Sequence, residues 1–245
     1  MKIHGIAVVV ASMMFPFLCP NCSLPFTVAK QAGSPLQISG EARAVTLRYD
    51  DGRQLDWYFS RIELKNTGAM PMLLVIVGSR LEGFSETIFN NSNVLDYYFE
   101  PKLLQPGKTE AVYWPKPTFG NPQVADRPLP PEARATARTA FVQFEDGTTW
   151  GDAAEGKEFL RSRAIIEKEL RRLLAVASEQ GPSEFTKQLL QSEPRTFGGL
   201  SVIDEIRDAY AAKKDPQAAL DKLKAMLQAA DEHRARLTAS TAARP

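Results

Sequence analysis

The stretch that decides the fold lies in the middle of the chain and reads Ala140-Phe141-Val142-Gln143-Phe144-Glu145-Asp146-Gly147-Thr148-Thr149-Trp150. Asp-Gly between two segments rich in β-forming residues predicts a two-residue hairpin turn, because both residues tolerate positive φ. Composition also changes here. Pro, Gly, Val, Thr and aromatic residues dominate before Trp150, whereas Ala, Leu, Glu, Lys and Arg dominate after it. We therefore expect a β-rich part that ends at this hairpin and a helical part that follows.

Upstream of the hairpin, apolar residues occur in short runs separated by turn residues, as is typical of antiparallel strands. The run 70–77 is apolar throughout, which indicates a central strand covered on both faces. Residues 90–93, Asn-Asn-Ser-Asn, are predicted to form a turn or loop. Prolines crowd residues 115–131, which predicts a long loop with no central strand. About seven strands in residues 36–150 predict an antiparallel β-sandwich.

Two turn motifs in this part carry a resemblance to a known family. Residues 62–68, Ile-Glu-Leu-Lys-Asn-Thr-Gly, are followed by Pro71, and residues 104–109 read Leu-Gln-Pro-Gly-Lys-Thr. The pair resembles the pattern of bacterial immunoglobulin-like and fibronectin-type-III-like envelope modules, over roughly residues 36–150. The chain differs from such modules in its long proline loop and in having no cysteine pair there. The resemblance implies an immunoglobulin-like sandwich over residues 30–151, and it transfers no functional residues.

The helical part begins at Asp152, which is a suitable N-cap. Gly181-Pro182 is expected to end the first helix, and Asp215-Pro216 to open the last one. Predicted helices cover residues 153–180, 183–191, 202–213 and 216–237, within an α-helical region 152–237 followed by a flexible tail, 238–245. The whole chain is thus expected to have a segregated α+β fold that ends in an α-helical hairpin or small bundle.

Each predicted helix carries a narrow apolar stripe, which must be covered by another helix, by the sheet or by another chain. On the last helix the stripe includes Leu220, Leu223 and Leu227. We hypothesise that this stripe packs on the first long helix. If it were exposed instead, it would indicate a partner, either another envelope protein or a second copy of the chain.

The N-terminus has the layout of a secretory signal peptide. One basic residue precedes the apolar run 6–15, and small residues, Thr27 and Ala29, stand before a possible cleavage site. The apolar run is shorter than the roughly 20 residues of a membrane-spanning helix. We predict a signal peptide, residues 1–29, cleaved after Ala29, and a protein exported to the periplasm or the outside with no stable membrane span. A lipid anchor and an uncleaved anchor are the alternatives.

The two cysteines, Cys19 and Cys22, have the spacing of zinc knuckles and thiol–disulfide enzymes. A structural zinc site needs four ligands, and the chain has no other thiolates to supply them. Cleavage after Ala29 would also remove both cysteines. The expectation is a mature protein without cysteine, disulfide or metal.

Histidine is equally scarce, because the chain holds only His4 and His233. His233 is surrounded in sequence by charged residues and is expected to be solvated rather than catalytic. A serine–histidine–acid triad, a cysteine nucleophile and a histidine-rich metal site are therefore not expected. The formal charge of +1 gives no basic surface for nucleic acid.

Acidic and aromatic residues leave two open possibilities. The acidic pairs Asp50-Asp51 and Glu145-Asp146, with Asp152, could bind a hard cation or hydrolyse a glycoside, although acidic hairpin tips are ordinary turn chemistry. Aromatic residues could instead form a sugar-stacking platform, although such rings usually fill a core. The platform candidates are Trp57, Tyr97, Tyr98 and Trp114, with Tyr58 and Trp150 beside them.

Together these patterns predict an exported, non-enzymatic protein without catalytic residues, cofactor or metal. Its expected role is protein–protein interaction or a structural module of the cell envelope. The alternatives are a carbohydrate-binding module and, third, a carboxylate-based hydrolase.

Overall fold

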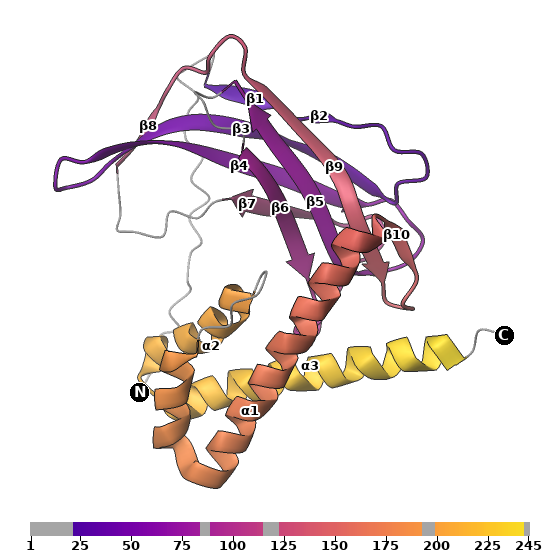
Figure 1. Cartoon of the computed structure of the whole chain (residues 1–245), viewed down its shortest axis with the longest axis vertical. Helices are drawn as coiled ribbons and strands as arrows, with labels where there is room; N and C mark the ends of the chain where they lie inside the picture. Colours follow the sequence, from indigo (N-terminus) through magenta and orange to yellow (C-terminus); the bar gives the residue numbers. More distant parts are fainter. Residues whose placement is uncertain (1–21, 84–88, 115–122, 193–198, 243–245) are drawn as a thin grey trace, which may run out of the picture.

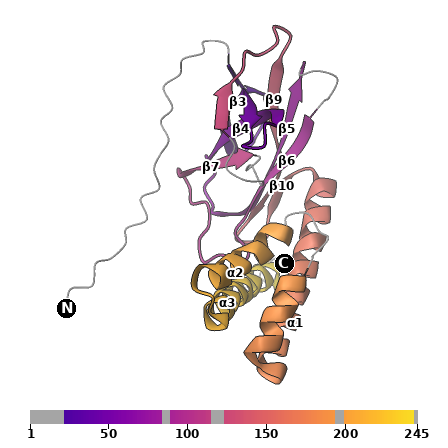
Figure 2. The same ribbon diagram turned by 90° about the vertical axis from the view of Figure 1, so that its left-hand side faces the viewer.

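The strand-rich and helical parts form separate regions of one fold. The computed structural model describes residues 22–83, 89–114, 123–192 and 199–242. Within them, two five-stranded sheets are followed by three helices, which lie together at one end of the sheets (Figures 1 and 2). The expected segregated α+β organisation is thereby confirmed.

The first sheet has the order β1-β3-β4-β7, with β8 also beside β3. Its longest strands, β3 and β4, form a hairpin that pairs continuously from Leu36↔Asn66 to Arg48↔Gln54. The prediction of a long loop at residues 115–131 is wrong for residues 123–126, which form β8; residues 115–122 lie outside the described part. Among the described strands β8 pairs only with β3, so it is an edge strand, as proline-rich surroundings permit. The strands are β1 (Ser23–Pro25), β3 (Leu36–Arg48), β4 (Gln54–Asn66), β7 (Thr109–Trp114) and β8 (Gln123–Asp126).

The second sheet has the order β10-β9-β5-β6, with β2 parallel to β9. β5 is central and buried over most of its length, as its apolar run predicts. The prediction of a loop at residues 90–93 is wrong, because these residues belong to β6 and pair with β5. Pairing in the sheet outweighs the weak β-propensity of Asn and Ser. The strands are β2 (Thr27–Val28), β5 (Met72–Glu82), β6 (Phe89–Asp96), β9 (Arg134–Phe144) and β10 (Thr149–Gly151).

The helices are α1 (Ala153–Gln191), α2 (Gly199–Lys213) and α3 (Pro216–Ala242). Asp152 caps α1 by accepting hydrogen bonds from the backbone of Ala154 and Glu155, as predicted. The predicted break at Gly181-Pro182 appears as a kink in α1, where Gly181 has φ 85°. The prediction of a loose tail is wrong as far as Ala242, because α3 continues to that residue; residues 243–245 lie outside the described part.

One hydrophobic core joins both sheets and all three helices. The helical residues that contact it include Leu170 and Leu173 of α1, and Leu223 and Leu227 of α3, all buried. Because α3 packs on α1 and α2, the hypothesis that the last helix docks on the first is confirmed. The apolar stripe of α3 is therefore largely covered inside the chain.

The N-terminal residues depart most from expectation. Strands β1 and β2 lie within residues 1–29, the stretch predicted to be removed as a signal peptide, and they pair with β3 and β9. Cleavage after Ala29 would remove both strands from the sheets. Cys22 is buried and disulfide-bonded in the full chain, so the predicted protein without a disulfide would require removal of this residue with the leader. Cys19 lies outside the described residues.

Candidate functional site

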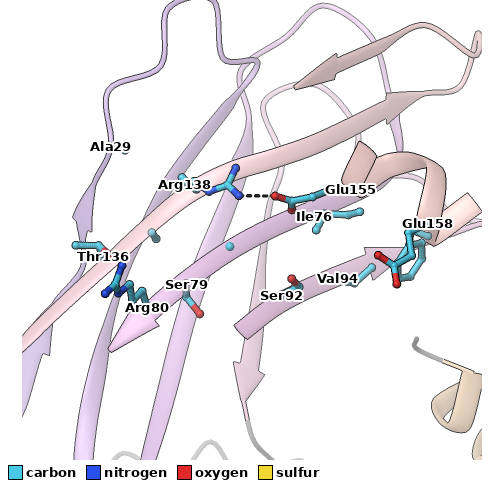
Figure 3. A pocket seen from close by; sticks show the side chains of 13 residues that line it. Ala29, Ile76, Ser79, Arg80, Ser92, Val94, Thr136, Arg138, Glu155 and Glu158 are labelled. Atoms are coloured by element: carbon cyan, nitrogen blue, oxygen red, sulfur yellow. Dashed lines mark hydrogen bonds and ion pairs between the residues drawn. The ribbon is translucent and has the colours of Figure 1, made fainter. Parts of the chain in front are cut away.

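A groove of about 510 Å³ lies on the outer face of the second sheet, where β5, β6 and β9 meet the first turns of α1 (Figure 3). We call it the β6 groove, after the strand at its open side. Its lining residues are Ala29, Ile76, Gly78, Ser79, Arg80, Ser92, Val94, Thr136, Ala137, Arg138, Glu155, Glu158 and Phe159.

The floor of the groove is low because Gly78, in the central strand, has no side chain. Gly78 is flanked by Ser92 of β6 and Arg138 of β9 in the sheet register. A Cβ atom at Gly78 would lie 3.5 Å from the Arg138 side chain, which is ordinary van der Waals contact. On the α1 side, Ile76 and Phe159 belong to a small apolar cluster with Val94 packed against it. The floor is thus apolar at the helix end and polar toward the far end.

The first turn of α1 is fixed closely on the sheet and closes one end of the groove. Gly156 allows this approach, since a Cβ there would lie 2.3 Å from the Phe141 ring. The cap at Asp152 sets the start of the helix, and Glu155 then projects toward Arg138 (Figure 3). These two side chains form an ion pair across the groove wall.

The rim carries both signs of charge. Arg138 pairs with Glu155, and Arg80 pairs with Glu82 at 2.6 Å. Glu158 is exposed and has no hydrogen bond or ion pair within the described residues. The rim therefore carries the Glu158 carboxylate, two guanidinium groups and the exposed hydroxyl groups of Ser92 and Thr136. Such a rim does not strongly favour a ligand of one charge.

The open side of the groove is bounded by an edge strand. β6 pairs with β5 alone among the described strands, so one side of its backbone has no sheet partner there. Edge strands are often protected by lysine or proline, and β6 contains neither. Asn93 of β6 is buried, and its amide nitrogen donates to the Ser79 hydroxyl at 2.9 Å, which ties β6 to β5 beneath the groove.

The structure does not bring the four predicted platform residues together on an exposed face. Tyr97 and Tyr98 are buried, with exposed fractions of 1% and 5%. Trp57, on β4, is partly buried, and its indole nitrogen has no hydrogen-bond partner in the described part of the chain. Trp114 ends β7, and its side chain lies outside the described part. Two of the four rings therefore cannot contribute to a sugar-stacking surface.

Tyr98 instead joins the sheets to the helices. Its hydroxyl donates to Glu167 of α1 at 3.1 Å, and the Arg163 guanidinium lies 4.6 Å from its ring centroid. Arg163 also donates to Asp96 at 2.7 Å and to Gln143 at 2.9 Å. This buried network satisfies the charge of Arg163 and fixes α1 against the end of the second sheet.

Tyr97 lies beside this network with a different environment. Burial raises the pKa of its phenol, and the nearby carboxylates of Glu110 and Glu100 add to the effect. The Tyr97 hydroxyl has no hydrogen-bond partner by geometry within the described residues, so burial is the cause that we assign. Its phenol stays neutral and structural.

The acidic residues and the histidine do not form a metal-binding cluster in the described residues. No three His, Cys, Asp or Glu side chains there lie close enough to hold a metal ion. Asp51 is exposed, and hydrogen bonds from Arg53 hold the pKa of its carboxyl below its usual value. The prediction of a solvated His233 is wrong, because it is only 3% exposed and its ring donates to the Glu100 carbonyl at 2.9 Å.

The sequence contained signals for the burial of His233 and for the position of the β6 groove. His233 continues the α3 stripe through Met226, Ala230 and Leu237 at spacings of four and three, which places it on the buried side of the helix. The break of the apolar run of β5 by Gly78-Ser79-Arg80 marks a place where one sheet face is not covered by apolar contacts. The remaining groove residues lie on distant segments, and no local pattern links them.

Comparison of the chain with protein-family models, with curated proteins and with solved structures finds no match. Within the described residues, none of the helices is both long and apolar enough to cross a membrane.

Proposed function

We propose that this protein is an exported, non-enzymatic binding module that holds an extended segment of another protein in the β6 groove. The observation that carries the proposal is that the groove lies directly beside an edge strand with no sheet partner among the described residues. An added strand could pair with the free backbone groups of β6 while its side chains enter the groove, as in β-augmentation.

The lining chemistry supports a polypeptide segment over a single charged ligand. Apolar contact is available from Ile76 and Phe159, and both signs of charge are available from Arg80, Arg138 and Glu158. A polypeptide can satisfy such a mixed surface with alternating side chains, whereas a phosphate or a metal ion would satisfy only part of it. Backbone pairing would supply affinity, and the groove would supply specificity.

Export is supported by the charged and apolar layout of the N-terminal residues and by the disulfide at Cys22, since disulfides persist in oxidising compartments. The resemblance to immunoglobulin-like envelope modules remains part of this proposal, and the two-sheet architecture of the strand-rich part is compatible with it.

The test is peptide binding by the whole protein and by two variants at one position. Dodecapeptides selected from a display library would be titrated by fluorescence anisotropy against wild type, Gly78→Leu and Gly78→Ala. We expect Gly78→Leu to fill the groove and weaken binding at least about tenfold, a change of about 1.4 kcal/mol. The Gly78→Ala variant is the matched control, because a single methyl group there makes only ordinary contacts.

NMR would locate the bound peptide independently. Amide shifts are expected along β6 and around Gly78 and not on the first sheet. A library without binders, or binders that are insensitive to Gly78→Leu, would count against the proposal. A glycoside hydrolase activity abolished by replacing a single carboxylate among Asp50, Asp51, Glu145, Asp146 and Asp152 would replace it with the hydrolase alternative.

A further inference from the structure

A second feature of the molecule is the segment 22–29, which connects the two sheets on the β9 side of the second sheet, and whose last residue, Ala29, also lines the β6 groove. Its first half, β1, is antiparallel to β3, with Leu24 opposite Ala42. Its second half, β2, is parallel to β9, with Val28 opposite Ala137. One short stretch of chain thus closes an edge of each sheet.

Hydrogen bonds continue on either side of these two strands. Ala44 donates its backbone N–H to the Cys22 carbonyl at 3.1 Å, and Phe26 donates to the Gly40 carbonyl at 3.0 Å. Ala29 donates to the Ala137 carbonyl, also at 3.0 Å. Backbone hydrogen bonds therefore join residues 22–26 to β3 in the first sheet and residues 27–29 to β9 in the second.

The next contact extends the ladder by means of a side chain. The Gln31 amide nitrogen donates to the Thr139 carbonyl at 2.9 Å, and the Thr139 N–H donates to the Gln31 amide oxygen at 2.8 Å. The amide group of Gln31 thus pairs with β9 as a backbone group would. These two hydrogen bonds extend the pairing along β9 beyond the end of β2.

The side chains of the segment contribute to the core at alternate positions. Phe26 is only 8% exposed and belongs to the main core cluster, and Leu24 and Val28 pack against the same cluster. The residues between them, Pro25 and Thr27, are exposed. This alternation of core-facing and exposed residues is typical of a strand with one face on a core. A signal peptide that is discarded has no need of it.

Removal of residues 1–29 would therefore expose the backbone edges of β3 and β9 and open the core where Phe26 lies. Unpaired edges of this kind promote aggregation. We infer that residues 22–29 remain in the mature protein as a permanent part of the fold, and that any cleavage of the leader takes place upstream of Cys22.

The first test is the N-terminus of the mature protein. The full chain with its own leader would be produced in an export-competent bacterium, and the folded product would be analysed by intact mass and N-terminal sequencing. An N-terminus at any position from Met1 to Cys22 is the expected result. A folded product that starts at Lys30 would overturn the inference.

The second test does not depend on export. Full-length Phe26→Ala is compared with Thr27→Ala, its exposed neighbour, by thermal unfolding. Loss of a buried aromatic side chain should lower Tm by on the order of 10 °C or prevent folding, whereas the control should stay within about 1 °C of wild type. Equal Tm values for the two variants would overturn the inference.

Discussion

The two margins of the second sheet are treated in opposite ways. At the β9 margin the chain supplies its own neighbours, β2 and β10, and then continues directly into α1. At the β6 margin the described residues supply no further strand, and a groove with both apolar and polar lining lies beside the edge. The first margin thus ends in two short strands of two and three residues beside α1, whereas the second ends in the eight-residue edge strand β6.

Because of this difference, we expect the β9 margin to contribute mainly to stability and the β6 margin mainly to binding. Substitutions at the β9 margin should lower the free energy of unfolding, since backbone pairing and buried side chains are lost there. Substitutions at the β6 margin should leave that free energy nearly unchanged and alter binding instead. Substitutions at the two margins can therefore be tested separately, by unfolding for the β9 margin and by peptide binding for the β6 margin.

The largest expected effect is at the β9 margin, at Gly151. This residue ends β10 with φ 102°, and a Cβ atom there would lie 2.3 Å from the Ala140 carbonyl oxygen. Gly151→Ala should therefore lower the free energy of unfolding by about 2–4 kcal/mol, because a clash with the backbone adds to the strain of positive φ. Urea unfolding measures the change.

Gly52→Ala is the matched control for the backbone strain. Gly52 has φ 83° at the β3–β4 turn, and a Cβ atom there would have no neighbour within 4 Å. Only the strain should remain, so we expect a loss of about 1–2 kcal/mol. If both variants lost the same amount, close packing at the β9 margin would not explain the importance of Gly151.

At the β6 margin, Ser92→Lys places a charge on β6 beside the groove. Ser92 is exposed, so the free energy of unfolding should change by no more than about 0.5 kcal/mol. Lysine on an edge strand opposes the addition of another strand, so peptide affinity in the β6 groove should fall about tenfold. Urea unfolding and fluorescence anisotropy measure the two effects.

The control for this charge is Thr109→Lys, which is exposed on β7 at an edge of the first sheet. It should change neither stability nor peptide affinity. Equal losses of affinity for both variants would indicate a general charge effect, and the distinction between the margins would fail.

Local chemistry predicted much of the fold. The hairpin at Asp146-Gly147, the cap at Asp152, the break at Gly181-Pro182 and the central strand β5 each depend on neighbouring residues in the sequence. The length of the hairpin turn is the exception: the prediction of two residues is wrong, because Phe144 bonds to Thr148 and leaves three residues between them. Such features can be inferred from a short window, because the conformational preferences of Gly, Pro and Asp act over a few residues.

The two margins, in contrast, could not be predicted in this way. Val28 pairs with Ala137, far along the chain, and the alternation of Leu24, Phe26 and Val28 is too short to distinguish a core strand from the end of a leader. At the groove, Gly78 meets Arg138 and Ser92 only through the order of the strands. Strand order is a long-range property that a single sequence does not specify locally.

The hydrogen bonds of Glu169 lie away from both margins, and they show how much a surface interaction contributes to the free energy of unfolding. Glu169 of α1 accepts hydrogen bonds from Arg172 at 2.8 Å and from the Ser192 hydroxyl at 2.5 Å, and Ser192 caps the far end of the same kinked helix. The bond from Arg172, with that from Ser192, holds the pKa of Glu169 below its ordinary value of 4.5. The ionised carboxylate thus favours the folded state.

Because the folded-state pKa is the lower one, this contribution is present above pH 4.5 and is lost as the pH falls through the folded-state value. Glu169→Gln should cost about 0.2–1 kcal/mol at pH 7, since Arg172 is largely exposed and the pair is screened. Urea unfolding should find a smaller difference between wild type and variant at pH 3. If the difference in the free energy of unfolding between wild type and Glu169→Gln stayed constant with pH, Glu169 would stabilise the kinked helix by packing and not by its charge. The size of a surface electrostatic effect, with which the two margins are compared, would then have to come from another ion pair.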